Sequence, residues 1–320
     1  MANRGARAVL TAATILGIVV VGLTYYTYHQ EIVRARARVA ADSQIVQTGC
    51  GPIEYAAAGS GPPLLIVHGA GGGFDQGMAF GEPFTDRFRV IAMSRFGYLR
   101  TPLPKDASAQ AQADAHACLL DALDIRQAAI IGASAGAPSA MQFALRHPRR
   151  TIALVLLVPA AYVPRPGGAP SMTSPPATPF LANTVLKSDF LFWAAIKLAR
   201  NTVIRSILAT PPEVVSGAGA DEQARIQSIL GSILPVSPRR LGLINDAVIT
   251  STLPRYELEK IATPTLAISC EDDLFGTFDG ARYTAEHIPG ARFLGYPRGG
   301  HLWVGHQNDI VAEIATFLSR

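Results

Sequence analysis

The chain is 320 residues long, and 49% of its residues are hydrophobic while only 16% are charged. This length fits one large domain with an insertion or two smaller domains, and the composition excludes a largely disordered protein. Residues 1–41 hold five arginines and one glutamate, so they carry the whole net charge of +4. Of 28 basic and 24 acidic residues, 23 of each remain for residues 42–320, and this neutral balance argues against nucleic-acid binding.

The first predicted element is a membrane-spanning helix over residues 8–28, AVLTAATILGIVVVGLTYYTY, which contains no charged residue. As a helix it would extend roughly 30 Å, about the thickness of a hydrocarbon core. We expect a retained single-pass anchor with a basic linker up to residue 41. The alternative is a signal peptide followed by secretion, since small residues at 35–37 and 39–41 resemble cleavage sites. Arginines flank the span so evenly that they do not indicate its orientation.

Eight short apolar runs after the linker predict β-strands. They are SQIVQT, PIEYAAAG, PLLIVHG, RVIAMS, QAAIIGAS, IALVLLVP, PTLAISC and ARFLGYP. Continuous apolar runs without alternation are typical of parallel strands that are covered on both faces. Helical stretches at 107–124 and 136–147 alternate with these runs. We therefore expect an α/β fold built on a mostly parallel, doubly wound sheet.

The three cysteines, Cys50, Cys118 and Cys270, are far apart in the sequence. They form neither a CxxC pair nor a zinc-ligand spacing, so we expect them to pack as small hydrophobic side chains. The sequence implies no metal ion and no organic cofactor.

A glycine-rich loop follows the third predicted strand, in the segment LLIVHGAGGG. The backbone of residues 68–71 can turn there and offer an N–H group to an oxyanion. A phosphate-binding loop is the alternative, but the segment lacks both the Walker lysine and the Rossmann spacing. We interpret His68 itself as a structural residue rather than a base.

Residues 132–136, Gly-Ala-Ser-Ala-Gly, place Ser134 between a predicted strand and a predicted helix, the setting of a nucleophile elbow. Glycine at positions 132 and 136 avoids the collision of side chains that such a sharp turn would cause. Because the helix begins at the serine, backbone N–H groups point to the place where an oxyanion would form. A turn made merely of small residues is the alternative.

Residues 162–253 interrupt the alternation of strands and helices, and we expect them to form an inserted helical cap. They begin with the proline- and glycine-rich stretch VPRPGGAPSMTSPPATP and continue with apolar helical segments. This division leaves residues 42–161 and 254–320 as the core. The stretch FLFWAAIKL within the cap either lines an acyl pocket, touches the bilayer or forms the cap's own core.

A base and its orienting acid are expected near the carboxyl terminus. His301 lies on a glycine-containing loop after the last predicted strand, and we prefer it to His306 as the base. Acidic residues 271–273 follow the strand PTLAISC; we prefer Asp273 as the acid, with Asp272 as the alternative. The order Ser134, Asp273, His301 is the one typical of α/β-hydrolases.

Residues 45–320 resemble the α/β-hydrolase superfamily, near its capped esterases, C–C bond hydrolases and haloperoxidase-like members. The resemblance is carried by the motifs HGAG at 68–71, SRFGYLRTP at 94–102 and GASAG at 132–136, together with Asp273 and Gly300-His301. It implies an α/β-hydrolase fold of about eight strands with a cap, in which Ser134 is the nucleophile, His301 the base and Asp273 the orienting acid. It further implies backbone oxyanion donors at Ala70 and Ala135, with Gly71 as an additional candidate. Cys270 stands where the family usually has glycine, which leaves the choice between Asp272 and Asp273 open.

The sequence thus predicts a membrane-anchored serine hydrolase that cleaves an ester or similar acyl bond of a small or amphipathic substrate. Serine at the elbow disfavours epoxide hydrolase and dehalogenase chemistry, which uses a carboxylate nucleophile. The alternatives are a C–C bond hydrolase of the same fold, acyl transfer to an alcohol, and a catalytically silent scaffold that binds a hydrophobic ligand. The sequence specifies neither the acyl group nor an oligomeric state.

Overall fold

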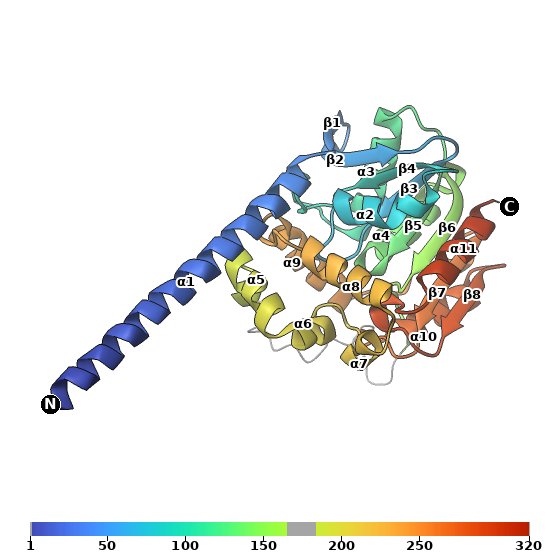
Figure 1. Cartoon of the computed structure of the whole chain (residues 1–320). Helices are drawn as coiled ribbons and strands as arrows, with labels where there is room; N and C mark the ends of the chain where they lie inside the picture. Colours follow the sequence, from blue (N-terminus) through green and yellow to red (C-terminus); the bar gives the residue numbers. More distant parts are fainter. Residues whose placement is uncertain (1, 165–183, 320) are drawn as a thin grey trace.

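The structure is a computed structural model that describes residues 2–164 and 184–319 (Figure 1). A single eight-stranded sheet forms its centre. The strands are β1 (Gln44–Thr48), β2 (Gly51–Ala58), β3 (Pro63–Val67), β4 (Arg89–Met93), β5 (Ala128–Ala133), β6 (Thr151–Leu157), β7 (Thr265–Cys270) and β8 (Arg292–Tyr296). Each strand overlaps one of the eight predicted apolar runs.

The strand order is β1-β2-β4-β3-β5-β6-β7-β8. The β1–β2 and β2–β4 pairs are antiparallel, and every later pair is parallel. The predicted mostly parallel sheet is therefore confirmed. Its inner strands are continuous apolar runs because neighbouring side chains, such as Leu64 and Leu65 of β3, pack into core clusters on opposite faces.

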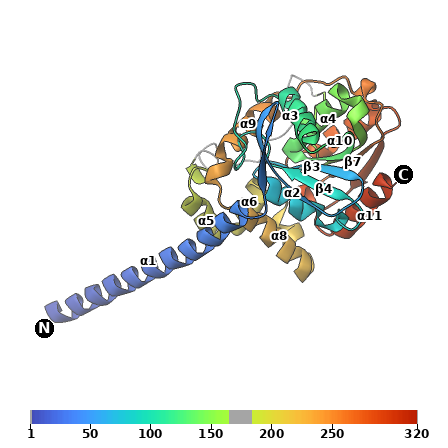
Figure 2. The same cartoon turned by 90° about the horizontal axis from the view of Figure 1, so that it is seen from above.

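Helices cover both faces of the sheet, which gives three layers (Figure 2). Side chains of α3, α4 and α10 pack into one core cluster and those of α11 into the other, with Met78 and Phe80 of α2 against the second. The bounds of these helices are α2 (Phe74–Gly81), α3 (Ala109–Ala122), α4 (Ala137–Arg146), α10 (Thr277–His287) and α11 (Gln307–Leu318). Short 3-10 turns lie at Glu82–Phe84, Ser134–Gly136, Pro148–Arg150, Ser237–Arg239, Leu258–Lys260 and Gly300–Leu302.

The strand order reverses between β3 and β5. After β3 the chain moves to β4 on one side, and after β5 it moves to β6 on the other. In open α/β sheets, ligands bind beside the carboxyl ends of the strands at such a switch point. The glycine-rich loop follows β3 and the Ser134 turn follows β5, so both lie at this point.

Among the described residues between β6 and β7, where the insertion is expected, there are five α-helices. They are α5 (Asp189–Leu198), α6 (Arg200–Ser206), α7 (Pro212–Ser216), α8 (Ala220–Ser232) and α9 (Arg240–Ser251). Phe192, Trp193 and Ile196 of α5 belong to a third apolar cluster, separate from the two that face the sheet. Most of the predicted proline- and glycine-rich stretch at 163–179 lies outside the described residues.

The amino-terminal helix α1 (Ala2–Ala40) projects from the body (Figure 1). Gly5–Ala40 is long and apolar enough to cross a membrane, by length and composition. Most of the predicted span 8–28 is exposed, with Val9 and Val21 each about 70% exposed. The helix continues past that span to Ala40, and its last turns contact the body beside α5.

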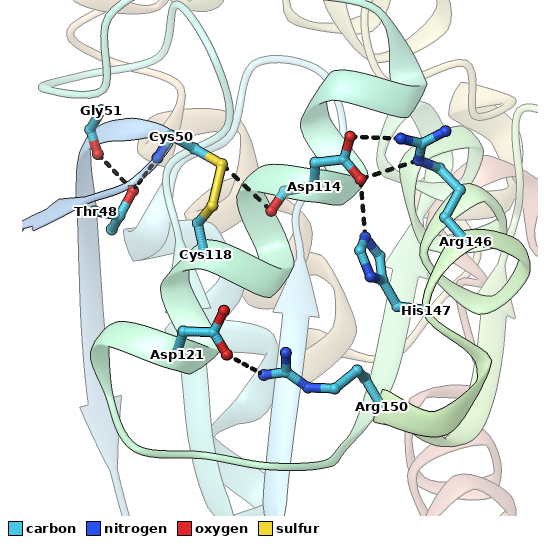
Figure 3. Close-up of a disulfide and its surroundings, with 9 residues drawn as sticks. All are labelled: Thr48, Cys50, Gly51, Asp114, Cys118, Asp121, Arg146, His147 and Arg150. Atoms are coloured by element: carbon cyan, nitrogen blue, oxygen red, sulfur yellow. Dashed lines mark hydrogen bonds and ion pairs between the residues drawn. A yellow bond between two sulfur atoms is a disulfide. The ribbon is translucent and has the colours of Figure 1, made fainter.

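The prediction of three unpaired cysteines is wrong for two of them. Cys50, in the β1–β2 turn, forms a disulfide with Cys118 of α3 (Figure 3). Cys270 is free and buried. Because α3 packs against the β1 edge of the sheet, the two Cα atoms come within 6.0 Å of each other. Their separation of 68 residues gives no local signal of this pairing.

Candidate active site

Ser134 lies at the tip of the turn between β5 and α4. Its φ of 48° is in the left-handed region, which residues other than glycine adopt rarely. Strain of this kind is typical of functional sites, where the surrounding structure holds the residue in place. The turn presents the Ser134 hydroxyl at the carboxyl edge of the sheet.

The two glycines that flank the serine are required by close packing. A Cβ atom at Gly132 would lie 2.5 Å from the Cβ of Ala140, and one at Gly136 would lie 2.5 Å from the carbonyl oxygen of Val67. Real Cβ atoms do not approach other atoms so closely, so neither position tolerates a side chain without a backbone shift. The tight strand-to-helix turn therefore depends on glycine at both positions.

Ser134, His301 and Asp273 form a continuous chain of polar contacts. The Oγ of Ser134 lies 2.9 Å from Nε2 of His301, and Nδ1 of that ring lies 2.8 Å from Oδ2 of Asp273. All three residues are buried. Asp273 is itself held by the backbone N–H of Phe275, 2.8 Å from Oδ1, and by the Thr277 hydroxyl, which donates to Oδ2.

The structure brings Asp273, and not Asp272, to the imidazole. Oδ1 of Asp272 accepts a hydrogen bond of 2.7 Å from the backbone N–H of Gly300, on the loop that carries His301. The competing base, His306, lies away from the serine: its Nε2 is 2.9 Å from the carbonyl oxygen of Arg298, and its ring stacks on Tyr296.

The loop after β3 packs directly against the Ser134 turn. A Cβ atom at Gly69 would lie 3.1 Å from the Cβ of Ser134, and the Gly69 N–H donates to Oε1 of Gln76. The next residue, Ala70, is exposed, and its N–H has no hydrogen-bond partner among the described residues. Ala135 follows the serine at the start of a 3-10 turn, where backbone N–H groups lack partners within the turn. Ala70 and Ala135 therefore remain the candidate oxyanion donors beside Ser134.

The prediction that Gly71 is an additional oxyanion donor is wrong. Its N–H donates to the hydroxyl of Tyr98, at a distance of 3.3 Å, so it is directed at the neighbouring loop and not at Ser134. The Tyr98 hydroxyl in turn donates to Oδ2 of Asp246 at 2.5 Å. A buried tyrosine therefore fixes the loop one residue past Ala70.

Tyr98 and Asp246 belong to a polar cluster behind the loop that was not predicted from the sequence. Arg95 makes two 2.6 Å contacts with the carboxylate of Asp246, which lies on α9, and its Nε donates to the carbonyl of His68. The expected structural role of His68 agrees with its contacts, since its Nε2 accepts from the Arg95 N–H. Burial, together with the charge of Arg95, lowers the pKa of His68 well below its ordinary value, so the ring is neutral at pH 7.

Arg95 and Tyr98 lie within the motif SRFGYLRTP at 94–102, which was the available signal for this cluster. Their partner Asp246 is 151 residues away from Arg95 and had no signal of its own. Within residues 2–164 and 184–319, no three His, Cys, Asp or Glu side chains lie close enough together to hold a metal ion.

The comparisons with known proteins agree with this architecture. Residues 62–203 match the family model described as alpha/beta hydrolase fold, a segment that includes the glycine-rich loop and the Ser134 turn. The solved alpha/beta hydrolase fold protein of Nakamurella multipartita is 26% identical, with a TM-score of 0.65, over 86% of this chain and 98% of that one. The chain belongs to the α/β-hydrolase superfamily.

Two relatives are similar over most of this α/β-hydrolase chain. The uncharacterized hydrolase YcgS of Bacillus subtilis is 24% identical over 80% of this chain and 91% of its own length. The 2-hydroxy-6-oxononadienedioate/2-hydroxy-6-oxononatrienedioate hydrolase of Paraburkholderia xenovorans is 28% identical over 80% of this chain and 87% of its own length. Several other curated relatives match over 30–40% of their length. The chain is accordingly a hydrolase of the α/β fold.

Proposed function

We propose that the chain is a serine hydrolase that cleaves an ester or similar acyl bond through the triad Ser134, His301 and Asp273. The observation that carries this proposal is the unbroken contact from the serine hydroxyl through the imidazole to the carboxylate, at 2.9 and 2.8 Å. These distances suit a base that removes the serine proton and an acid that orients the ring. The strained turn at Ser134 and the unpartnered N–H of Ala70 support the same assignment.

In the proposed reaction, His301 takes the Ser134 proton while Oγ bonds to the acyl carbon. The N–H groups of Ala70 and Ala135 stabilise the oxyanion that forms on the former carbonyl oxygen. The tetrahedral intermediate then breaks its bond to the leaving alcohol, which receives the proton from His301. Water, deprotonated by His301, attacks the acyl-enzyme, and Ser134 regains the proton as the acid leaves. The net reaction converts an ester and water into an acid and an alcohol.

The test is labelling with a fluorophosphonate followed by peptide mapping. We expect one adduct on Ser134 in the wild type and none in the Ser134→Ala variant, which should also lose ester turnover by several orders of magnitude, roughly 10⁴-fold or more. An adduct on a different peptide, or intact turnover by the variant, would contradict the assignment of Ser134 as the nucleophile. Absence of labelling in folded wild-type protein would instead favour a silent scaffold.

A second candidate reaction is hydrolysis of a carbon–carbon bond next to a ketone. The similarity to the Paraburkholderia hydrolase over 80% of the chain favours it, and the same serine and histidine would serve. Product analysis separates the two reactions. An ester gives an acid and an alcohol, whereas a diketone-like substrate gives an acid and a second fragment that carries a new C–H bond.

We also infer that α1 is a retained membrane anchor and that residues 162–253 form a cap. Cleavage at the small residues 35–37 or 39–41 would remove Ile32 and Ala35, which are 3% and 4% exposed within the apolar cluster of α5. It would also remove Glu31, which accepts a 2.9 Å hydrogen bond from Nε1 of Trp193. If the anchor is retained, sequencing of the purified protein should find a mature amino terminus upstream of residue 8, the first residue of the apolar span.

A further inference from the structure

The last turns of α1 are an integral part of the folded body. Besides the buried Ile32 and Ala35, the Tyr28 ring packs edge-on against Phe190 and Trp193 of α5. The two views of the chain show this end of α1 beside α5, while the rest of the helix extends away (Figures 1 and 2). The position of the anchor is therefore set by the helices between β6 and β7.

Arg38, near the end of α1, reaches beyond α5 to a buried ion pair. Its Nη2 donates to the carbonyl oxygens of Ser232, at 3.1 Å, and Leu234, and its Nε lies 3.9 Å from Oδ2 of Asp75. Arg239 binds the same two groups, since its Nη2 donates to Oδ2 of Asp75 at 2.7 Å and to the Ser232 carbonyl at 3.1 Å. The two arginines thus share one carboxylate and one carbonyl.

Arg239 connects this cluster to the loop beside the nucleophile. Its side chain is fully buried, and its Nη1 donates to the carbonyl oxygen of Gly72, two residues after Ala70. Asp75 lies in the first turn of α2, directly after the same loop. A buried arginine that loses its carboxylate partner is left with an uncompensated charge, so this pair resists rearrangement. The loop is therefore clamped at Gly72 by Arg239, just as it is held at Gly71 by Tyr98.

We propose that Arg239, Asp75 and Arg38 position the 69–73 loop for oxyanion stabilisation, so that the amino-terminal helix is a component of the catalytic scaffold as well as a tether. The proposal rests on the proposed serine hydrolase function. None of the three side chains touches the reacting atoms; they act through the backbone of the loop. An oxyanion donor must lie within a few tenths of an ångström of its optimal position, so a loosened loop lowers turnover more than substrate binding.

The experiment uses the full chain in detergent and compares Arg38→Ala, Arg38→Lys and Glu31→Ala with the wild type. Glu31→Ala is the matched control, because Glu31 contacts Trp193 and Lys197 of α5 but not the loop. Two quantities are measured: kcat per active site, with sites counted by fluorophosphonate titration, and deuterium uptake of peptides covering residues 69–80.

Arg38→Ala should lower kcat about 3- to 10-fold, change KM less than about 2-fold and increase deuterium uptake over residues 69–80. Arg38→Lys should recover part of the kcat, since an ammonium group still pairs with Asp75. Glu31→Ala should retain the kcat and the loop uptake of the wild type.

Three results would overturn the proposal. They are an unchanged kcat and loop uptake in Arg38→Ala, a loss of titratable sites at constant kcat per site, and an equal loss of kcat in Glu31→Ala. The second would show that Arg38 only stabilises the fold, and the third that any weakening of α1 docking has the same effect. If Ser134→Ala keeps its turnover, the proposed function fails, and deuterium uptake still decides whether Arg38 holds the loop.

Discussion

Asp272 and Asp273 are adjacent in the sequence and carry the same side chain, yet only Asp273 contacts His301. We predict that Asp273→Asn lowers kcat roughly 10⁴-fold, because an amide cannot stabilise the imidazolium or fix the ring in the productive tautomer. Asp272→Asn should change kcat little, because its amide oxygen still accepts from the Gly300 N–H. The measurement is kcat per fluorophosphonate-titrated site; equal losses in the two variants would contradict the assignment.

Tyr98 is fully buried and links the loop at Gly71 to Asp246. We predict that Tyr98→Phe lowers the free energy of unfolding by about 1–3 kcal/mol, because it leaves a buried N–H and a carboxylate oxygen without that partner. Tyr283→Phe is the matched control, since the Tyr283 hydroxyl binds Arg255 at the surface, and it should change stability by less than about 0.5 kcal/mol. Urea unfolding in detergent measures both, and equal effects would contradict the prediction.

Local signals predicted the individual residues that the structure brings together, and the residues without such signals were missed. Ser134 lies between two glycines after an apolar strand, and His301 follows the last strand, so each could be found in a short window. Arg239 and Asp75 are 164 residues apart, and neither window looks unusual. The sequence does not show where the N–H of Gly71 points, so Gly71 could not be separated from Ala70 as a candidate oxyanion donor.

At the scale of elements, α3 and α4 meet around a buried histidine. His116 of α3 is completely buried, with Nε2 3.1 Å from the Ser139 hydroxyl of α4. Burial lowers its pKa from 6.5 to about 3. The unfolded chain therefore binds a proton that the folded protein does not, so stability falls as the pH decreases below 6.5.

Between pH 7.5 and 5.0 this one group should cost about 2 kcal/mol of stability. We predict that His116→Gln removes that part of the pH dependence, as measured by urea midpoints at the two pH values. Ser139→Ala should keep the wild-type dependence, because burial and not the hydroxyl depresses the pKa. If His116→Gln loses as much stability between pH 7.5 and 5.0 as the wild type does, the ring does not titrate in this way.

The inner strands could be predicted because burial on both faces requires continuous apolar runs, which are visible in the sequence. The full length of α1 could not. The apolar stretch ends at residue 28, but the helix continues to Ala40, since Ile32 and Ala35 pack into an apolar cluster whose other buried members lie more than 150 residues later in the chain. Tertiary packing, and not the local pattern, decides where this helix ends.

For the whole molecule, the Cys50–Cys118 disulfide ties the β1–β2 edge of the sheet to α3 across 68 residues. Closing a loop of this length restricts the unfolded chain, and its loss should cost roughly 4 kcal/mol. We predict that wild-type protein melts at a lower temperature in dithiothreitol, whereas the Cys50→Ser/Cys118→Ser variant melts at one low temperature with or without it. A reductant-independent melting temperature in the wild type would contradict a structural disulfide.

The same disulfide determines the expected topology, which the evenly divided arginines leave open. Structural disulfides form and persist in oxidising compartments and are rare in the cytosol. If α1 spans the membrane, the catalytic body should therefore lie on the oxidising side, with residues 1–7 on the cytosolic side. A carboxyl-terminal fusion to alkaline phosphatase, which is active only where its disulfides form, should be active, and the matching fusion to a cytosol-dependent fluorescent protein should be dark. The reverse pattern would place the body in the cytosol, where the bond between Cys50 and Cys118 would not be expected to persist.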